Sequence, residues 1–206
     1  MRVPPPQNDT WDEHARTALA VLSDGDRGDQ GDRDERDERR DRGEAGDALA
    51  TLVRHPDLAE ALLTVNTHLL LRSTLPPRLR ELAILRVARR RGCEYQWTHH
   101  ARLAAEAGLT EAEIEAAGRG EAADALELAV LDAVDELDDD SALSGRTSAA
   151  LGEHLDEHQR MDLVFTIGTY CMLAMAFNTF GVESGGGPGA GRQTAPAADS
   201  RTSAGR

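Results

Sequence analysis

The pattern that most restricts the fold of this chain is a run of helix-like segments between residues 48 and 182. The apolar residues of these segments recur at helical spacing. None of the segments alternates apolar and polar residues with the period of two that a half-buried strand needs. Aromatic residues are only 3% of the chain, which also favours packed helices, because strands prefer aromatic and β-branched side chains. We therefore predict an all-α domain.

The ends of these helices are marked by residues with known capping roles. One predicted helix spans about 57–72, and the next begins at the two prolines of "LPPRLRELAILRVARRRG" and ends at Gly92. A third spans 93–107, and Thr110 and Glu113 have the spacing of a capping box at the start of a fourth. The remaining predicted helices lie at about 125–138, 144–155 and 157–180.

The composition changes sharply on both sides of this region. Residues 24–47 contain eleven acids, six arginines and one alanine, too little apolar surface to offset the entropy of ordering the chain. The predicted organisation is a helical segment at 1–23, a disordered acidic insertion at 24–47, the helical domain at 48–182 and a flexible Gly/Pro/Ser/Ala tail at 184–206.

Charge and cysteine content narrow the class of protein. A formal net charge of −14 argues against a nucleic-acid-binding protein, which needs a basic surface to replace counterions. Two cysteines 78 positions apart make no disulfide framework and favour the cytoplasm. The N-terminus has no signal-peptide pattern, and the most apolar stretch, 163–177, is too short to span a bilayer. We expect a soluble protein with no membrane partner.

The segment 157–180 is apolar on nearly every side, as a helix buried all round would be. A domain of this size has few places to bury such a helix. The expected partner is therefore a second copy of the chain, which makes the protein a homo-oligomer.

Three residues that carry chemistry are predicted to lie close together. On a helix over 93–107, Cys93, Gln96 and His100 share one face, at i, i+3 and i+7. Glu81 shares a face with the apolar stripe of the preceding helix. A short turn at Gly92 lets the two helices pack as an antiparallel hairpin, which would bring Glu81, Cys93 and His100 together.

This arrangement predicts an activated thiol or a proton-transfer site. A buried carboxylate tends to have a raised pKa and can relay a proton from histidine, and a helix N-terminus favours the thiolate of Cys93. His99 points about 100° away from the stripe of His100 and is excluded from the site. One cysteine and one or two histidines do not complete a zinc site. The structural alternative is a buried cysteine and a hydrogen-bonded core histidine; Cys171 is interpreted as a core residue.

The stretch "LPPRLRELAILRVARRRGCEYQWTHHARLAAEAGLTEAEI", with "LELAVLDAVDEL" and "GTYCMLAMAFNTFGV", resembles the carboxymuconolactone decarboxylase family, which includes alkyl hydroperoxidase D-like proteins. The resemblance covers roughly residues 48–182. It implies a helical bundle assembled as a trimer or hexamer, with no metal and no organic cofactor.

The hydroperoxidase branch implies a peroxiredoxin-like antioxidant activity. Its pattern is a glutamate, a Cys-x-x-Cys pair and a histidine four residues later. Glu81, Cys93 and His100 match the catalytic positions, but Gln96 replaces the second cysteine. After peroxide oxidises Cys93, an external thiol reductant or Cys171 would have to restore it.

Two alternatives remain open at this point. The first is a cofactor-free decarboxylase of a small lactone carboxylate, with Glu81 or His100 as the acid. Its cationic clamp would be one of four arginines: Arg78, Arg80, Arg86 or Arg102. The second is a non-catalytic oligomeric member of the family.

Overall fold

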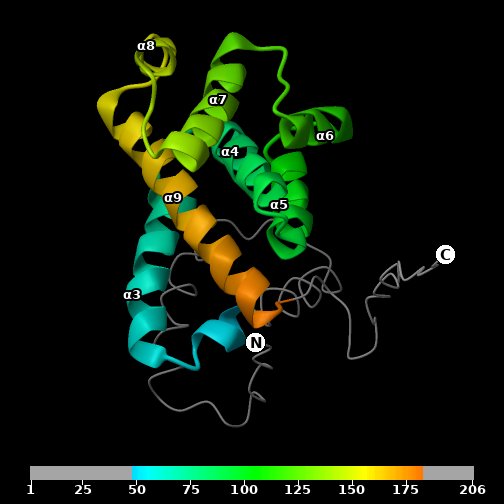
Figure 1. The fold of residues 1–206 in the computed structure, drawn as a ribbon, viewed down its shortest axis with the longest axis vertical. Helices are drawn as coiled ribbons and strands as arrows, with labels where there is room; N and C mark the ends of the chain where they lie inside the picture. Colours follow the sequence, from blue (N-terminus) through cyan, green and yellow to red (C-terminus); the bar gives the residue numbers. More distant parts are fainter. Residues whose placement is uncertain (1–47, 183–206) are drawn as a thin grey trace, which may run out of the picture.

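The computed structural model describes residues 48–182, and Figure 1 shows them as an assembly of packed helices without a strand. The all-α prediction is confirmed. After helical residues 48–52, the elements in order are α3 (Pro56–Thr67), the π-helix η2 (His68–Arg72), α4 (Pro77–Arg90), α5 (Glu94–Glu106), α6 (Glu111–Arg119), α7 (Ala125–Asp140), α8 (Gly145–Gly152) and α9 (Glu157–Phe180). The segments predicted at 1–23, 24–47 and 184–206 lie outside the described residues.

Helix α4 is the centre of the fold and packs against α5, α6, α7 and α9. Eight of its fourteen residues are buried, so its amphipathic pattern is wide enough to face several neighbours. Ion pairs fix its alignment with α7: Arg78 contacts Glu127 and Arg86 contacts Asp135. Both pairs are separated by 49 positions, so α4 and α7 run in the same direction.

Helices α4 and α5 form the predicted hairpin. Gly92 has a φ of +57°, the left-handed conformation that glycine adopts without strain, and it turns the chain between the two helices. Glu81 and Ala104 of the facing helices are both fully buried. The hairpin positions the candidate site, since it holds residues from α4 and α5 against each other.

The predicted helix ends are largely confirmed. Thr110 and Glu113 form the expected capping box at the start of α6. The segment predicted as one helix over 57–72 differs, because α3 ends at Thr67 and the chain continues as the π-helix η2. Short π-helical segments are frequent at functional sites, and Leu70 of η2 lines the pocket described below.

Within a single chain, helix α9 is buried on one side only, and the expectation that a second copy of the chain covers the rest stays a prediction. One side packs on the core through Leu163, Ile167 and Tyr170, whereas Phe165 and Met172 of the other side are exposed. Its neighbours cover only one side of a 24-residue helix. By length and composition alone, α9 is also apolar enough to cross a membrane, and 44% of its most apolar 18-residue stretch is buried.

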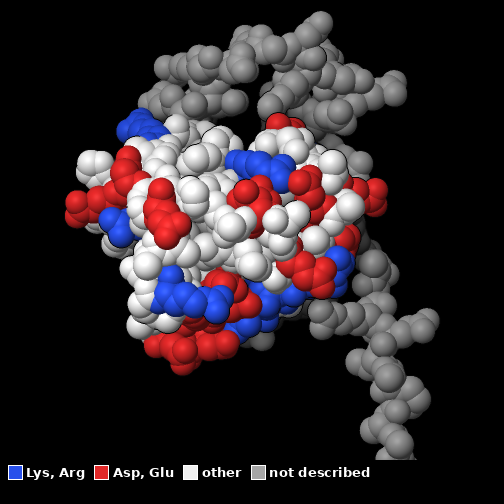
Figure 2. All heavy atoms as spheres, turned by 90° about the horizontal axis from the view of Figure 1, so that it is seen from above, with Lys and Arg blue, Asp and Glu red and all other residues white. Residues whose placement is uncertain are grey.

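The charged side chains of the described residues are interspersed. Figure 2 shows acidic and arginine side chains scattered among uncharged ones on the face that it presents. Many are paired, for example Arg90 with Asp138 and Arg119 with Glu121.

Asp162 of α9 fixes the segment that joins η2 to α4. Its carboxylate accepts hydrogen bonds from the Thr74 amide at 2.7 Å, the Thr74 hydroxyl at 2.9 Å and the Ser73 hydroxyl at 3.0 Å. His68 lies 3.3 Å from the other oxygen. Burial alone raises the pKa of Asp162, but these hydrogen bonds outweigh it and lower the pKa.

Replacing Asp162 by alanine is expected to reduce the free energy of unfolding by about 1–3 kcal/mol, because three hydrogen bonds to a charged carboxylate are lost. The pKa of Asp162 is lowered on folding. The difference in the free energy of unfolding between the wild type and the variant is therefore largest above about pH 4, and it shrinks as the carboxyl protonates at lower pH. Urea unfolding from pH 3 to 7 measures this. As a control, Asp132→Ala removes an exposed pair with Arg146 and should cost less than about 1 kcal/mol.

Candidate functional site

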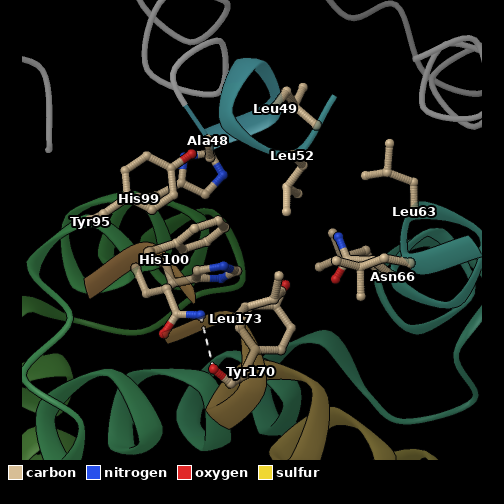
Figure 3. Close-up of a pocket in the computed structure, with 14 residues that line it drawn as sticks. Ala48, Leu49, Leu52, Leu63, Asn66, Tyr95, His99, His100, Tyr170 and Leu173 are labelled. Atoms are coloured by element: carbon tan, nitrogen blue, oxygen red, sulfur yellow. Dashed lines mark hydrogen bonds between the residues drawn. The ribbon is translucent and has the colours of Figure 1, made fainter. Parts of the chain in front are cut away.

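The site is a cavity of about 170 Å³ between the N-terminal described residues, α5 and α9. Figure 3 shows its labelled side chains converging on this space. Most of the walls are apolar, and the polar groups lie mainly on the α5 and α9 side. The lining residues are Ala48, Leu49, Leu52, Leu62, Leu63, Asn66, Leu70, Tyr95, Gln96, His99, His100, Tyr170, Leu173 and Phe177.

A buried acid–base pair stands at this cavity. His100 Nδ1 lies 2.7 Å from Glu81 Oε2, and their side chains are only 5% and 1% exposed. The other carboxylate oxygen of Glu81 accepts a hydrogen bond from Arg80 Nε at 3.0 Å. Arg80 also donates to the Leu70 carbonyl, which ties the pair to η2. The predicted proximity of Glu81 and His100 is confirmed.

The predicted rise in the pKa of Glu81 is wrong. Burial does raise the pKa, but the hydrogen bonds and positive charges of His100 and Arg80 outweigh it, and the net effect lowers the pKa of Glu81. Glu81 is therefore an ionised anchor for His100. An ionised carboxylate only accepts hydrogen bonds. Nδ1 of His100 therefore carries a hydrogen atom and donates a hydrogen bond to Glu81.

Nε2 of His100 is the ring nitrogen left for chemistry. It has no hydrogen-bond partner among residues 48–182, and His100 lines the cavity. The ring contacts Tyr170 edge-on, with ring centroids 4.9 Å apart. Burial and then the charge of Glu81 raise the pKa of Tyr170, so its hydroxyl stays protonated.

Gln96 occupies the position of the missing second cysteine. Its Nε2 donates to the Tyr170 carbonyl at 3.1 Å, which fixes the amide and leaves Oε1 buried without a hydrogen-bond partner. Oδ1 of Asn66, on the α3 wall, is also buried without one. Both residues line the cavity. A buried acceptor without a partner is costly, and a ligand N–H or O–H can satisfy it.

Cys93 lies behind the cavity wall. It is 1% exposed and packs in a hydrophobic cluster with Tyr95, Leu173 and Phe177, three residues that line the cavity. No hydrogen bond joins its sulfur to Glu81 or His100. Burial raises its pKa more than the nearby amides of Gln96 and Tyr95 lower it, so the expected stabilisation of the thiolate is not found.

Cys171 has a different environment from the one predicted. It is half-buried instead of being a core residue, and its sulfur lies 3.7 Å from Asp138 Oδ1, beside Arg91. Burial raises its pKa, while Arg91 lowers it. Both cysteines are free. Since Cys93 and Cys171 belong to different packing clusters, the geometry gives no support to resolution of one by the other.

None of the four candidate clamp arginines lines the cavity. Arg78 binds Glu113 and Glu127, and Arg86 binds Asp135. Arg80 is held by Glu81, and Arg102 pairs with Glu106. Among the described residues that line the cavity, there is therefore no arginine to hold a substrate carboxylate.

Several lining residues were not predicted from the sequence. His99 was excluded from the site, but it lines the cavity and its ring is parallel to that of Tyr95, with centroids 6.2 Å apart. Asn66 and Tyr170 were not singled out either. A tyrosine within an otherwise apolar helix was a usable signal for Tyr170, because a buried hydroxyl needs a polar environment. Among the described residues, no three His, Cys, Asp or Glu side chains are grouped to hold a metal ion.

Comparisons with known proteins bear on the family. The sequence model of the carboxymuconolactone decarboxylase family matches residues 56–139. No curated protein matches the chain. Among solved structures, a cysteine-to-alanine variant of the debrominase Bmp8 in complex with 2,3,4-tribromopyrrole is 16% identical, with a TM-score of 0.65, over 90% of this chain and 92% of that chain. The apo form of Bmp8 is 17% identical, with a TM-score of 0.64, over 89% and 91%.

The Bmp8 structures share the fold with this protein. The family match includes the α4–α5 hairpin that carries Glu81 and His100. Residues 56–139 of this chain are therefore similar to the carboxymuconolactone decarboxylase family.

Proposed function

We propose that this protein is an enzyme that transfers a proton between His100 and a small, uncharged, largely apolar substrate. The observation that carries the proposal is the buried Glu81–His100 pair, which leaves one imidazole nitrogen available at an apolar cavity. Glu81 fixes the ring and its tautomer, and Nε2 accepts or returns the proton.

The size and polarity of the cavity define the substrate class. A cavity of about 150 Å³ in another protein holds benzene, so a cavity of about 170 Å³ suits one small ring or a short branched chain. Leucines on several sides favour an apolar body, and the amide oxygens of Gln96 and Asn66 favour a substrate that donates a hydrogen bond. 2,3,4-Tribromopyrrole, the ligand of the Bmp8 variant, is a small ring with an N–H group and belongs to this class.

The lactone carboxylate is the less favoured substrate. Moving an unpaired carboxylate into an apolar cavity is costly, and the arginines that would have held it are bound elsewhere. Decarboxylation of an anionic substrate would need one of these ion pairs to break first.

The test of this proposal compares two ligands that differ only in charge. We expect 2,3,4-tribromopyrrole to bind measurably by isothermal titration calorimetry, and the same ring carrying a carboxylate to bind at least tenfold more weakly. Leu62→Trp, which fills the cavity, should abolish binding of the uncharged ring. The exposed substitution Leu128→Trp is the matched control and should leave binding unchanged. Equal or tighter binding of the carboxylate would contradict the proposal.

A second proposed function is thiol-linked reduction of an organic hydroperoxide. It is favoured by the position of Cys93 directly behind residues that line the cavity. His100 would take the thiol proton through a bound molecule, and the sulfur would attack the terminal peroxide oxygen. The O–O bond then breaks, and His100 returns the proton to the departing alkoxide, which leaves a sulfenic acid and an alcohol. An external thiol converts the sulfenic acid into a mixed disulfide with loss of water, and a second thiol then releases Cys93.

This second function makes a prediction about Cys93. Because burial raises the pKa of its thiol, oxidation of Cys93 by tert-butyl hydroperoxide should be slow at pH 7 and accelerate as the pH rises above 9. Mass spectrometry of the sulfenic acid after trapping measures the rate. Cys93→Ser should abolish peroxide consumption with dithiothreitol as the reductant, whereas Cys171→Ser should retain it. Unchanged consumption in Cys93→Ser excludes the thiol function and leaves the proton-transfer proposal standing.

A further inference from the structure

Tyr170 carries a hydroxyl group that no residue among 48–182 binds. The residue is only 3% exposed and belongs to the main core cluster, and its one hydrogen bond among the described residues is made by its backbone carbonyl. A buried tyrosine hydroxyl usually has a partner, because an unpaired one costs free energy. Phenylalanine would fill the same space without that cost. The unpaired hydroxyl therefore points to a ligand.

The Tyr170 hydroxyl belongs to the same cavity as the ring nitrogen that exchanges the proton in the proposed function. Tyr170 lines the cavity, and Figure 3 shows its side chain rising from α9 beside His100. The two rings meet edge-on, with an interplanar angle of 87° and centroids 4.9 Å apart. Gln96 fixes the α9 backbone here, since its Nε2 donates to the Tyr170 carbonyl at 3.1 Å. One small ring in the cavity can therefore contact His100 and Tyr170 together.

Proton transfer to His100 creates two charges in the cavity. The positive charge, on the imidazolium, is balanced by Glu81, whose Oε2 lies 2.7 Å from Nδ1. The negative charge lies on the substrate, and no arginine lines the cavity among the described residues. Burial and then the charge of Glu81 raise the pKa of Tyr170, so its hydroxyl keeps the proton that makes it a donor. A fixed donor in a site without water is well suited to stabilise a developing oxyanion.

The other polar groups of the cavity wall are less suited to this role. The ring of Tyr95 is parallel to that of His99, whereas the ring of Tyr170 meets His100. The buried amide oxygen of Gln96 accepts hydrogen bonds and would repel an anion. Tyr170 is therefore the hydroxyl that the geometry places beside the reacting nitrogen.

We propose that the Tyr170 hydroxyl donates a hydrogen bond to the substrate oxygen that becomes negative as His100 removes a proton from the neighbouring carbon. This inference rests on the proton-transfer function proposed above and narrows its substrate to a small ring with an enolisable carbonyl group. Nε2 of His100 takes the proton, the C–H electron pair forms a C=C bond, and the C=O π electrons move to the oxygen.

The reaction is completed by the same residues. His100 returns the proton to the oxygen or, in a conjugated ring, to another carbon. The overall change is a tautomerisation, in which nothing is oxidised or reduced and no co-reactant is consumed.

The experiment uses 4-nitrophenol, whose phenolate resembles the enolate and absorbs visible light that the neutral phenol does not absorb. At a pH where the free compound is mostly neutral, we expect the full-length wild type to bind it as the phenolate, with its proton on His100. Tyr170→Phe removes only the hydroxyl. It should weaken binding by about tenfold or more and return the bound ligand to the neutral spectrum, because a hydrogen bond to a charged group is lost.

The matched control is Thr166→Val. It removes another buried hydroxyl without a partner, on the same helix but outside the cavity lining, and should change neither affinity nor spectrum. If Tyr170→Phe binds like the wild type with the same spectrum, while His100→Ala loses the phenolate, the role of Tyr170 is wrong and the proton-transfer function stands. A phenolate that persists in His100→Ala would contradict both.

Stability shows whether the hydroxyl has a structural role instead. Tyr170→Phe should unfold at the same or a higher urea concentration than the wild type, because it loses only an unpaired polar group. The wild type alone gives a second test, which needs no variant to fold. Nitrobenzene, the same ring without the hydroxyl oxygen, should bind about tenfold or more weakly than 4-nitrophenol. Equal binding of the two, or binding of 4-nitrophenol only in its neutral form, would overturn the proposal.

Discussion

If the proposed proton transfer is correct, replacing His100 by alanine is expected to reduce kcat/KM for the proposed substrate by about 10²–10⁴-fold, the usual contribution of a positioned general acid or base. His100 is the residue of the buried pair that reaches the cavity, because Glu81 is fully buried and does not line it. Alanine removes the nitrogen that exchanges the proton and keeps the apolar walls. Ligand binding should therefore change much less than turnover.

The measurement is steady-state kinetics with binding followed in parallel by calorimetry. Glu81→Gln keeps the size of the side chain but removes the charge that fixes the tautomer of His100, so its effect should be smaller than that of His100→Ala and should change the pH profile. His154→Ala, at an exposed histidine between α8 and α9, is the matched control and should leave the rate unchanged. A His100→Ala variant that turns over within twofold of the wild type would exclude the proton-transfer function.

Replacing Glu81 by alanine is expected to reduce the free energy of unfolding by about 3–5 kcal/mol, the usual cost of breaking a buried ion pair by removing one partner. Glu81 is 0% exposed and is bound on one side by His100 and on the other by Arg80. Alanine leaves the Arg80 guanidinium, only 15% exposed, without its carboxylate. It also leaves a void in a well-packed core.

The pH dependence gives a second signature of this pair. The pKa of Glu81 is lowered on folding, so its stabilising contribution is full above about pH 4.5, the range of an unfolded glutamate, and is lost as the pH falls through the lower folded-state pKa. Guanidinium unfolding at pH 7 and at pH 3 should show the difference between wild type and variant shrinking at acid pH.

Two further variants control for this effect. Glu106→Ala removes an exposed pair with Arg102 and should cost less than about 1 kcal/mol. The double variant Glu81→Ala/His100→Ala should be less destabilised than the sum of the single changes, because it leaves only one of the two former partners unpaired. A loss below about 1 kcal/mol in Glu81→Ala would show that Arg80 and His100 find other partners.

The sequence by itself determined the helices and the proximity of Glu81 and His100, two of the three predicted site residues. Helical spacing, the glycine at 92 and the capping box at Thr110 act over a few residues, so they can be recognised without knowing the fold. The pairing of Glu81 with His100 could be predicted in the same way, because the two residues lie on consecutive helices that are joined by the short turn at Gly92. The apolar character of α9 was also evident, although not which side of it would be covered.

Only the tertiary structure decided the properties that depend on several elements at once. Packing of the N-terminal described residues and α9 against the hairpin enclosed the cavity and placed Cys93 behind its wall. Arg80 and His100 together reversed the expected shift in the pKa of Glu81. Burial and pKa values depend on which groups of distant segments surround a side chain, whereas helix formation depends on residues within one or two turns.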